Sequence, residues 1–129
     1  MADILIVDDD IDIADVLAVI LISHGHEVRV ARNGEEGLSL VYARKPDLVL
    51  LDVEMPVLGG PEMAYRIFVH DLGYEEVPII LTSGVLDLPR VAAAVGTPYY
   101  LAKPYLIDAL LPLVDRALRE RIPPVPRLP

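Results

Sequence analysis

The feature that most constrains the fold of this chain is a set of four short apolar runs, each of which ends abruptly in polar residues. Their composition is typical of strands that are buried on both faces of a parallel sheet. Polar residues at the carboxyl ends of parallel strands meet at one edge of the sheet, so we expect a site there. The runs and their ends are Ile4–Val7 with Asp8-Asp9-Asp10, Leu48–Leu51 with Asp52, Ile79–Leu81 with Thr82-Ser83-Gly84, and Tyr99–Ala102 with Lys103-Pro104.

Segments with helical spacing of apolar residues separate these runs, so that strand and helix alternate five times. We expect a short second strand around Val28 and Val30, and a fourth strand over Val77–Leu81. The expected helices follow Asp10, run from an N-cap at Asn33 to Arg44, open at Pro61, span Pro89–Val95, and run from about Ile107 to about Arg121.

This alternation predicts an α/β fold of the (βα)₅ flavodoxin-like type, a three-layer sandwich around a parallel sheet of strand order 2-1-3-4-5. The first and third strands then flank the point where the winding reverses, which brings Asp8, Asp9 and Asp52 together. Residues 1–121 are expected to form this domain, and residues 122–129 a Pro-rich tail. Pro112 falls inside the last helix, so that helix is expected either to begin late, with Asp108 near its cap, or to kink.

Charge and composition narrow the classes of function. The net charge is −9 and the pI is near 4.6, which argues against non-specific binding to nucleic acid or to an anionic membrane. The chain has no Cys, so a disulfide framework and a thiol nucleophile are excluded. No apolar run approaches the length of a membrane span, and no signal-type segment precedes the first strand, so a cytoplasmic location is expected.

The predicted edge combines carboxylates, hydroxyls and one ammonium group, which suits a magnesium ion and a phosphoryl group. Mg²⁺ prefers oxygen ligands and is usually held by few carboxylates together with phosphate. Asp10 is interpreted as a helix N-cap or first-turn acid rather than as a metal ligand.

Four segments, each at a strand end, resemble in their sequence and in their order along the chain the receiver domain of two-component response regulators. They are Ile4–Asp10, Pro46–Gly60, Pro78–Gly84 and Tyr100–Tyr105. The resemblance implies that Asp8 and Asp9 hold Mg²⁺, for which Mn²⁺ could substitute. It also implies that Asp52 is the phosphoacceptor and a metal ligand, and that the backbone carbonyl of Glu54 is a further ligand.

The same resemblance assigns Lys103 to the phosphoryl oxygens and implies a cis Lys103-Pro104 peptide bond. The family carries a Ser or Thr followed by Ala or Gly in this part of the chain. Ser83 and the adjacent Thr82 are the two candidates for the hydroxyl residue, and Ser83 fits better because the small Gly84 follows it. Ser83 is then expected to bond the phosphoryl group and to act with Tyr100 as a switch, as a hydroxyl and an aromatic residue do in the family.

The implied function is that of a phosphorylation-operated switch. Such a protein catalyses only its own phosphorylation and dephosphorylation and is not otherwise an enzyme. Its expected partners are a sensor histidine kinase or phosphotransfer protein, and a target that docks on the face formed by the fourth helix, fifth strand and fifth helix. A monomer and a phosphorylation-driven homodimer are both left open. Two alternatives are a Mg²⁺-dependent phosphohydrolase with Asp52 as nucleophile and an adaptor that works without phosphorylation.

Overall fold

The computed structural model describes residues 2–52, 77–84, 88–104 and 106–123. Its elements are β1 (Asp3–Val7), α1 (Ile11–Ser23), β2 (Glu27–Ala31), α2 (Gly34–Ala43), β3 (Leu48–Asp52), β4 (Ile79–Ser83), α4 (Leu88–Val95), β5 (Tyr99–Ala102) and α5 (Ile107–Glu120). The helix expected to open at Pro61, Glu54 and the end of the tail lie outside the described residues.

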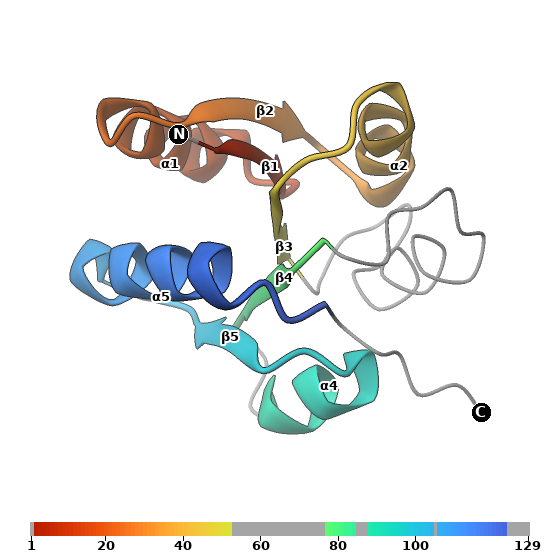
Figure 1. Cartoon of the computed structure of the whole chain (residues 1–129), viewed down its shortest axis with the longest axis vertical. Helices are drawn as coiled ribbons and strands as arrows, with labels where there is room; N and C mark the ends of the chain where they lie inside the picture. Colours follow the sequence, from red (N-terminus) through yellow and green to blue (C-terminus); the bar gives the residue numbers. More distant parts are fainter. Residues whose placement is uncertain (1, 53–76, 85–87, 105, 124–129) are drawn as a thin grey trace.

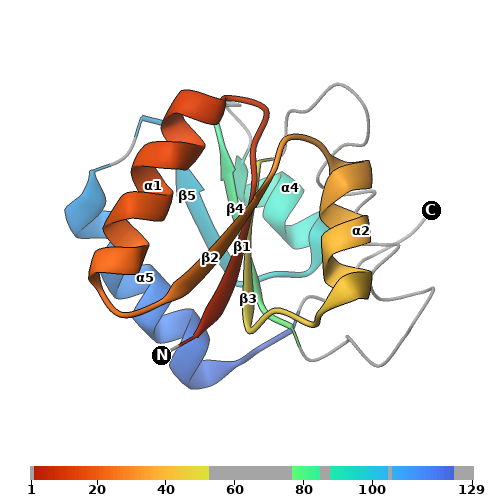
Figure 2. The same ribbon diagram turned by 90° about the horizontal axis from the view of Figure 1, so that it is seen from above.

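The five strands form one parallel sheet in the order β2-β1-β3-β4-β5, as the sequence predicts. Figure 1 shows α1 and α5 on one face of the sheet and α2 and α4 on the other, and Figure 2 shows the same layers from above. None of the described helices is long and apolar enough to cross a membrane.

Each face of the sheet is sealed by its own apolar core, because strand side chains alternate between faces. Leu5, Val49 and Leu81 point toward α2 and α4, whereas Ile4, Leu50 and Ile80 point toward α1 and α5. Strands β1, β3 and β4 are thus covered on both faces, which explains their near-continuous apolar sequences.

Side-chain caps set where two helices begin. The side chain of Asn33 accepts a hydrogen bond from the Glu36 backbone N–H at 2.9 Å, so α2 begins where the sequence predicts. Asp10 caps α1 in the same way through the N–H of Ile13, at 3.3 Å. The interpretation of Asp10 as an N-cap is therefore confirmed.

The sequence misplaces strand β4 but correctly places helix α5. Strand β4 spans Ile79–Ser83, two residues beyond the expected Val77–Leu81, because Thr82 pairs with both β3 and β5 and Ser83 pairs with β5. Helix α5 spans Ile107–Glu120, which confirms the expected helix from about Ile107 to about Arg121, and it continues through Pro112 without the late start that was one of the two alternatives. Pro112 is tolerated on the exposed side of the helix.

Tyr99 links β5 to the end of α5 through a hydrogen bond and through the packing of its ring. Its side chain is fully buried, its hydroxyl donates to Glu120 Oε1 at 2.9 Å, and the Arg116 guanidinium lies 5.3 Å from the ring centroid. Burial, followed by the bond to Glu120, raises the pKa of the Tyr99 hydroxyl, and the same bond lowers the pKa of Glu120.

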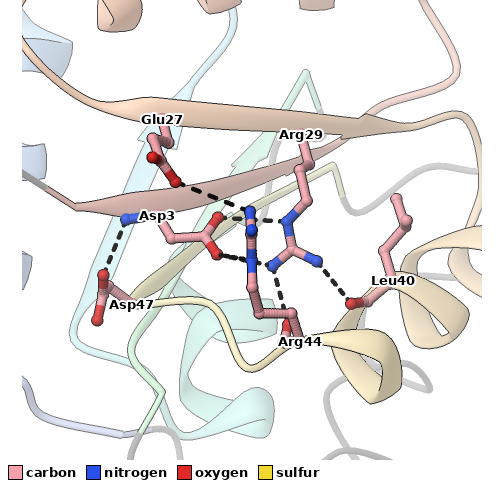
Figure 3. A network of polar contacts seen from close by, with 6 residues as sticks. All are labelled: Asp3, Glu27, Arg29, Leu40, Arg44 and Asp47. Carbon is pink, nitrogen blue, oxygen red and sulfur yellow. Dashed lines mark hydrogen bonds and ion pairs between the residues drawn. The ribbon is translucent and has the colours of Figure 1, made fainter.

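A charged network holds the amino-terminal edge of the sheet, opposite the predicted site (Figure 3). The Asp3 carboxylate accepts hydrogen bonds from Arg29 at 3.1 Å and from Arg44 at 2.8 Å. Arg29 also donates to the carbonyls of Leu40, at 2.7 Å, and Arg44, at 2.9 Å. Its guanidinium therefore binds carbonyl groups at the end of α2, where a positive charge is favourable.

We expect Arg29→Met to lower the free energy of unfolding by about 2 kcal/mol, because Asp3 loses a half-buried partner and α2 loses its donor. Urea unfolding monitored by circular dichroism measures this change. Arg32→Met is the matched control, because the Arg32–Glu36 pair is exposed and should contribute less than about 0.5 kcal/mol. Equal losses in the two variants would contradict a special role for Arg29.

Candidate functional site

The polar ends of β1, β3, β4 and β5 meet at the carboxyl edge of the sheet, as predicted. Val7 pairs with Leu51, so Asp8 and Asp52 follow on adjacent strands. Asp52 itself pairs with Thr82, and Ser83 pairs with Ala102, immediately before Lys103. The sheet register thus places side chains from four distant segments at one edge.

Three carboxylates form an acidic cluster at this edge. Asp8, Asp9 and Asp52 each offer one oxygen atom, and these atoms lie within 4.8 Å of one another. Asp8 and Asp52 are buried, whereas Asp9 is exposed. Like charges this close repel one another, so a cation at this position is favoured.

The backbone around Asp8 fixes the direction of its carboxylate. The Asp8 N–H donates to the Ala31 carbonyl at 3.0 Å, which extends the pairing of β1 with β2. Asp8 Oδ1 accepts a hydrogen bond from the Asp10 N–H at 2.9 Å. An all-oxygen cluster with one exposed member suits Mg²⁺, which keeps some of its waters.

Lys103 is the cation that the structure brings to this cluster. Its Nζ lies 3.1 Å from Asp8 Oδ2 and 3.6 Å from Asp52 Oδ2. Its backbone N–H donates to the Ser83 carbonyl at 2.8 Å, and the Lys103-Pro104 peptide bond is cis, as expected. Lys103 is thus held at both its backbone and its side chain.

The contact between Lys103 and Asp8 is a feature that the sequence analysis missed. In the sheet, β3 and β4 lie between β1 and β5, so strand adjacency gives no signal for it. Only a long side chain can reach across two strands, and Lys provides one.

The two candidate hydroxyl residues of the predicted switch lie at the end of β4, and its aromatic residue lies on β5. Ser83 and Thr82 are both buried, whereas the Tyr100 side chain is 41% exposed. The choice of Ser83 over Thr82 stays a prediction, and so does the movement of Tyr100. Glu54, the other expected ligand, lies outside the described residues.

Comparisons with known proteins give consistent relatives. Protein PilH of Pseudomonas aeruginosa is 37% identical to this chain over 92% of the chain and 98% of PilH. The nitrogen assimilation regulatory protein NtrX of Azorhizobium caulinodans is 34% identical over 90% of the chain but only 26% of NtrX. The chain therefore spans about a quarter of one relative and nearly all of another.

A solved structure agrees in fold and in sequence. The response regulator protein TrrA from Thermotoga maritima, crystallised in complex with Mg²⁺ and BeF, has a TM-score of 0.79 and 32% identity, over 90% of this chain and 98% of TrrA. A model of the response regulator receiver domain family matches residues 4–115. With a match over most of its length, this chain belongs to the response regulator receiver domain family.

Proposed function

We propose that this protein is a phosphorylation-operated signalling switch that accepts a phosphoryl group on Asp52 from a histidine kinase or a phosphotransfer protein. The observation that supports this most strongly is the cluster of Asp8, Asp9 and Asp52 beside Lys103. Receiver domains are typically regulatory phosphoacceptors that work with histidine kinases or phosphotransferases.

The proposed step is a displacement at phosphorus. A carboxylate oxygen of Asp52 forms the new P–O bond while the P–N bond of a phosphohistidine breaks. The electron pair of that bond returns to the imidazole nitrogen. Lys103 is close enough to balance negative charge on the phosphoryl oxygens, which is the main contribution a protein makes to such a transfer. Attack of water on the phosphorus of the aspartyl phosphate later breaks the P–O bond to Asp52, which restores the carboxylate and releases inorganic phosphate.

Mg²⁺ is the proposed cofactor, with Asp8, Asp9, Asp52 and the backbone carbonyl of Glu54 as ligands. When bound, the ion would neutralise charge on the phosphoryl group and orient it. Lys103 Nζ lies 3.1 Å from Asp8 Oδ2, so its ammonium group already offsets part of the negative charge of the proposed metal site. We therefore infer that Lys103 serves as the counter-ion of Asp8 until the metal arrives.

The proposed output is carried by Ser83 and Tyr100. Ser83 bonds the phosphoryl group, and Tyr100 on β5 then turns inward from its exposed position. The face formed by α4, β5 and α5 carries Tyr100 and would dock a target, or the phosphoryl group would be relayed onward. Residues 1–121 act as the receiver domain, followed by the tail, and the switch works as a monomer or as a phosphorylation-driven homodimer.

We expect Asp52→Asn to abolish labelling by acetyl phosphate and Mg²⁺ while the fold is kept. An amide is a poor nucleophile, and Asp8 and Asp9 should be poorer nucleophiles than Asp52 because metal ligation would tie up their lone pairs. Intact-protein mass spectrometry measures the added phosphate, and Asp15→Asn, an exposed change on α1, is the control that should label normally. Full labelling of Asp52→Asn would remove Asp52 from its proposed role.

We expect Mg²⁺ to raise the free energy of unfolding by about 2.7 kcal/mol at a hundredfold excess over its Kd. Thermal unfolding with and without Mg²⁺ measures this, and Mn²⁺ is tested in the same way. Asp9→Ala should lose most of the effect. Asp10→Ala should keep the Mg²⁺ effect but lose about 1 kcal/mol without metal, because Asp10 is an N-cap. A Tm that ignores Mg²⁺ would argue against the site.

We expect Ser83→Ala to label with acetyl phosphate but to show a weakened response at Tyr100 after beryllofluoride is added. The hydroxyl is the group that would join the phosphoryl oxygen to β4. Thr82→Val should respond like the wild type, and NMR of the tyrosine signals distinguishes the variants. The reverse result would move the switch hydroxyl from Ser83 to Thr82.

A further inference from the structure

Strand β5 leads directly into Lys103, yet its own pairing with the sheet is limited. It has four residues and lies at the edge of the sheet, where it pairs with β4 alone among the described strands (Figure 1). An edge strand has ladder hydrogen bonds on one side only. The position of Lys103 therefore depends on the contacts that hold β5 in register.

A change of this register would remove Lys103 from the acidic cluster. One residue advances a strand by about 3.3 Å. That step is as long as the distances from Lys103 Nζ to Asp8 Oδ2 and to Asp52 Oδ2, which are 3.1 Å and 3.6 Å. A slip by one residue would also turn every side chain of the strand to the other face. Lys103 can reach both carboxylates only while the register of β5 is kept.

The side chain of Thr97 joins the start of β5 to β4. Its hydroxyl donates to the Ile79 carbonyl at 2.6 Å and accepts a hydrogen bond from the Tyr99 N–H at 3.2 Å. Ile79 and Tyr99 are the first residues of the two strands, so this hydroxyl links the strands where their pairing begins. At the other end of β5, the Lys103 N–H donates to the Ser83 carbonyl.

Thr97 is itself held firmly. It is 5% exposed, and its backbone N–H donates to the Ala92 carbonyl at the end of α4, at 3.1 Å. A buried hydroxyl with two partners keeps its place, because water cannot replace the hydrogen bonds that it would lose by moving. Thr97 thus gives β5 a fixed starting point relative to both α4 and β4.

Tyr99 opposes a slip of β5 at the same position along the strand. Its ring is fully buried in the apolar core between the sheet and α5, and a slip by one residue would turn it toward the opposite face. Replacing this ring would open the core, whereas replacing the Thr97 hydroxyl removes hydrogen bonds without changing the apolar packing of α5. Thr97 is therefore the residue at which the register can be tested.

We propose that Thr97 is a positioning residue for phosphoryl transfer to Asp52. Its hydroxyl sets the register of β5 and thereby holds Lys103 beside Asp8 and Asp52. Thr97 precedes β5 and Lys103 follows it, so Thr97 acts only through the strand. The inference rests on the proposed function, because that function gives Lys103 the task of balancing charge on the phosphoryl oxygens.

The first measurement needs neither metal nor phosphate. The full chain is treated with a trace of the N-hydroxysuccinimide ester of acetic acid, and peptide mass spectrometry gives the ratio of acetylation at Lys103 to acetylation at the exposed Lys45. Thr97→Val should raise this ratio about threefold, because Lys103 leaves its ion pairs. Thr97→Ser keeps the hydroxyl and should keep the ratio of the wild type.

Matched variants separate the hydroxyl from side-chain size and from stability. Thr97→Ala and Thr97→Ser differ by the hydroxyl alone, so they repeat the comparison if Thr97→Val does not fold. Val41→Ala is the control for lost stability, because Val41 is buried on α2, away from β5. It should leave the acetylation ratio unchanged.

The second measurement compares metal binding with labelling of Asp52. Thr97→Val should be labelled by acetyl phosphate and saturating Mg²⁺ about tenfold more slowly than the wild type, because Lys103 is misplaced. Calorimetric titration should show Mg²⁺ binding at least as tight as in the wild type, since an ammonium group that leaves Asp8 no longer repels the ion. A role in stability alone would weaken metal binding and labelling together.

Three outcomes would overturn the proposal. They are an acetylation ratio that stays unchanged in Thr97→Val and Thr97→Ala, a rise of the same size in Thr97→Ser, and a rise of the same size in Val41→Ala. A wild type that acetyl phosphate does not label would refute the proposed function instead. The acetylation ratio would still decide whether Thr97 positions Lys103, so the two failures are distinguishable.

Discussion

The arrangement of the whole carboxyl edge follows from placing two buried carboxylates side by side. A parallel sheet gives Asp8 and Asp52 adjacent strands, and burial removes the water that would otherwise separate their charges. The ammonium group of Lys103, which directly follows β5, offsets these charges. The backbone of Lys103 is held in place because its N–H donates to the Ser83 carbonyl. Three features therefore act together to offset the two buried negative charges. They are the strand order, the position of the last strand and the length of a lysine side chain.

The two edges of the sheet differ in how far their negative charges are compensated by cationic side chains. At the amino-terminal edge, Asp3 is matched by Arg29 and Arg44, so that its charge is compensated within the chain (Figure 3). Among the described residues, three carboxylates at the carboxyl edge face the ammonium group of Lys103. The second edge keeps an excess of negative charge and remains ready to bind a cation, whereas the first has no such excess to relieve.

The sequence predicts the fold and the acidic cluster because both follow from local patterns. Apolar runs identify β1 and β3, and the winding rule then makes Asp8 and Asp52 neighbours. The contact of Lys103 with Asp8 could not be predicted in this way, since it depends on a side-chain conformation that spans two strands. The end of β4 was misplaced because Thr82 and Ser83 look like loop residues, although both are buried. The exposure of Ile13 and Val16 on α1 was also not predicted, because helical spacing alone does not say which apolar residues face the core.

The bond between Tyr99 and Glu120 has a consequence for how the molecule opens. The last turn of a helix ordinarily frays, and its amide protons exchange first. In α5 that turn cannot separate from the sheet without breaking the Tyr99 hydrogen bond and exposing a fully buried ring. The end of α5 and strand β5 therefore form a single cooperative unit, and a slow-exchanging region extends from the middle of the sheet to the carboxyl end of its last helix.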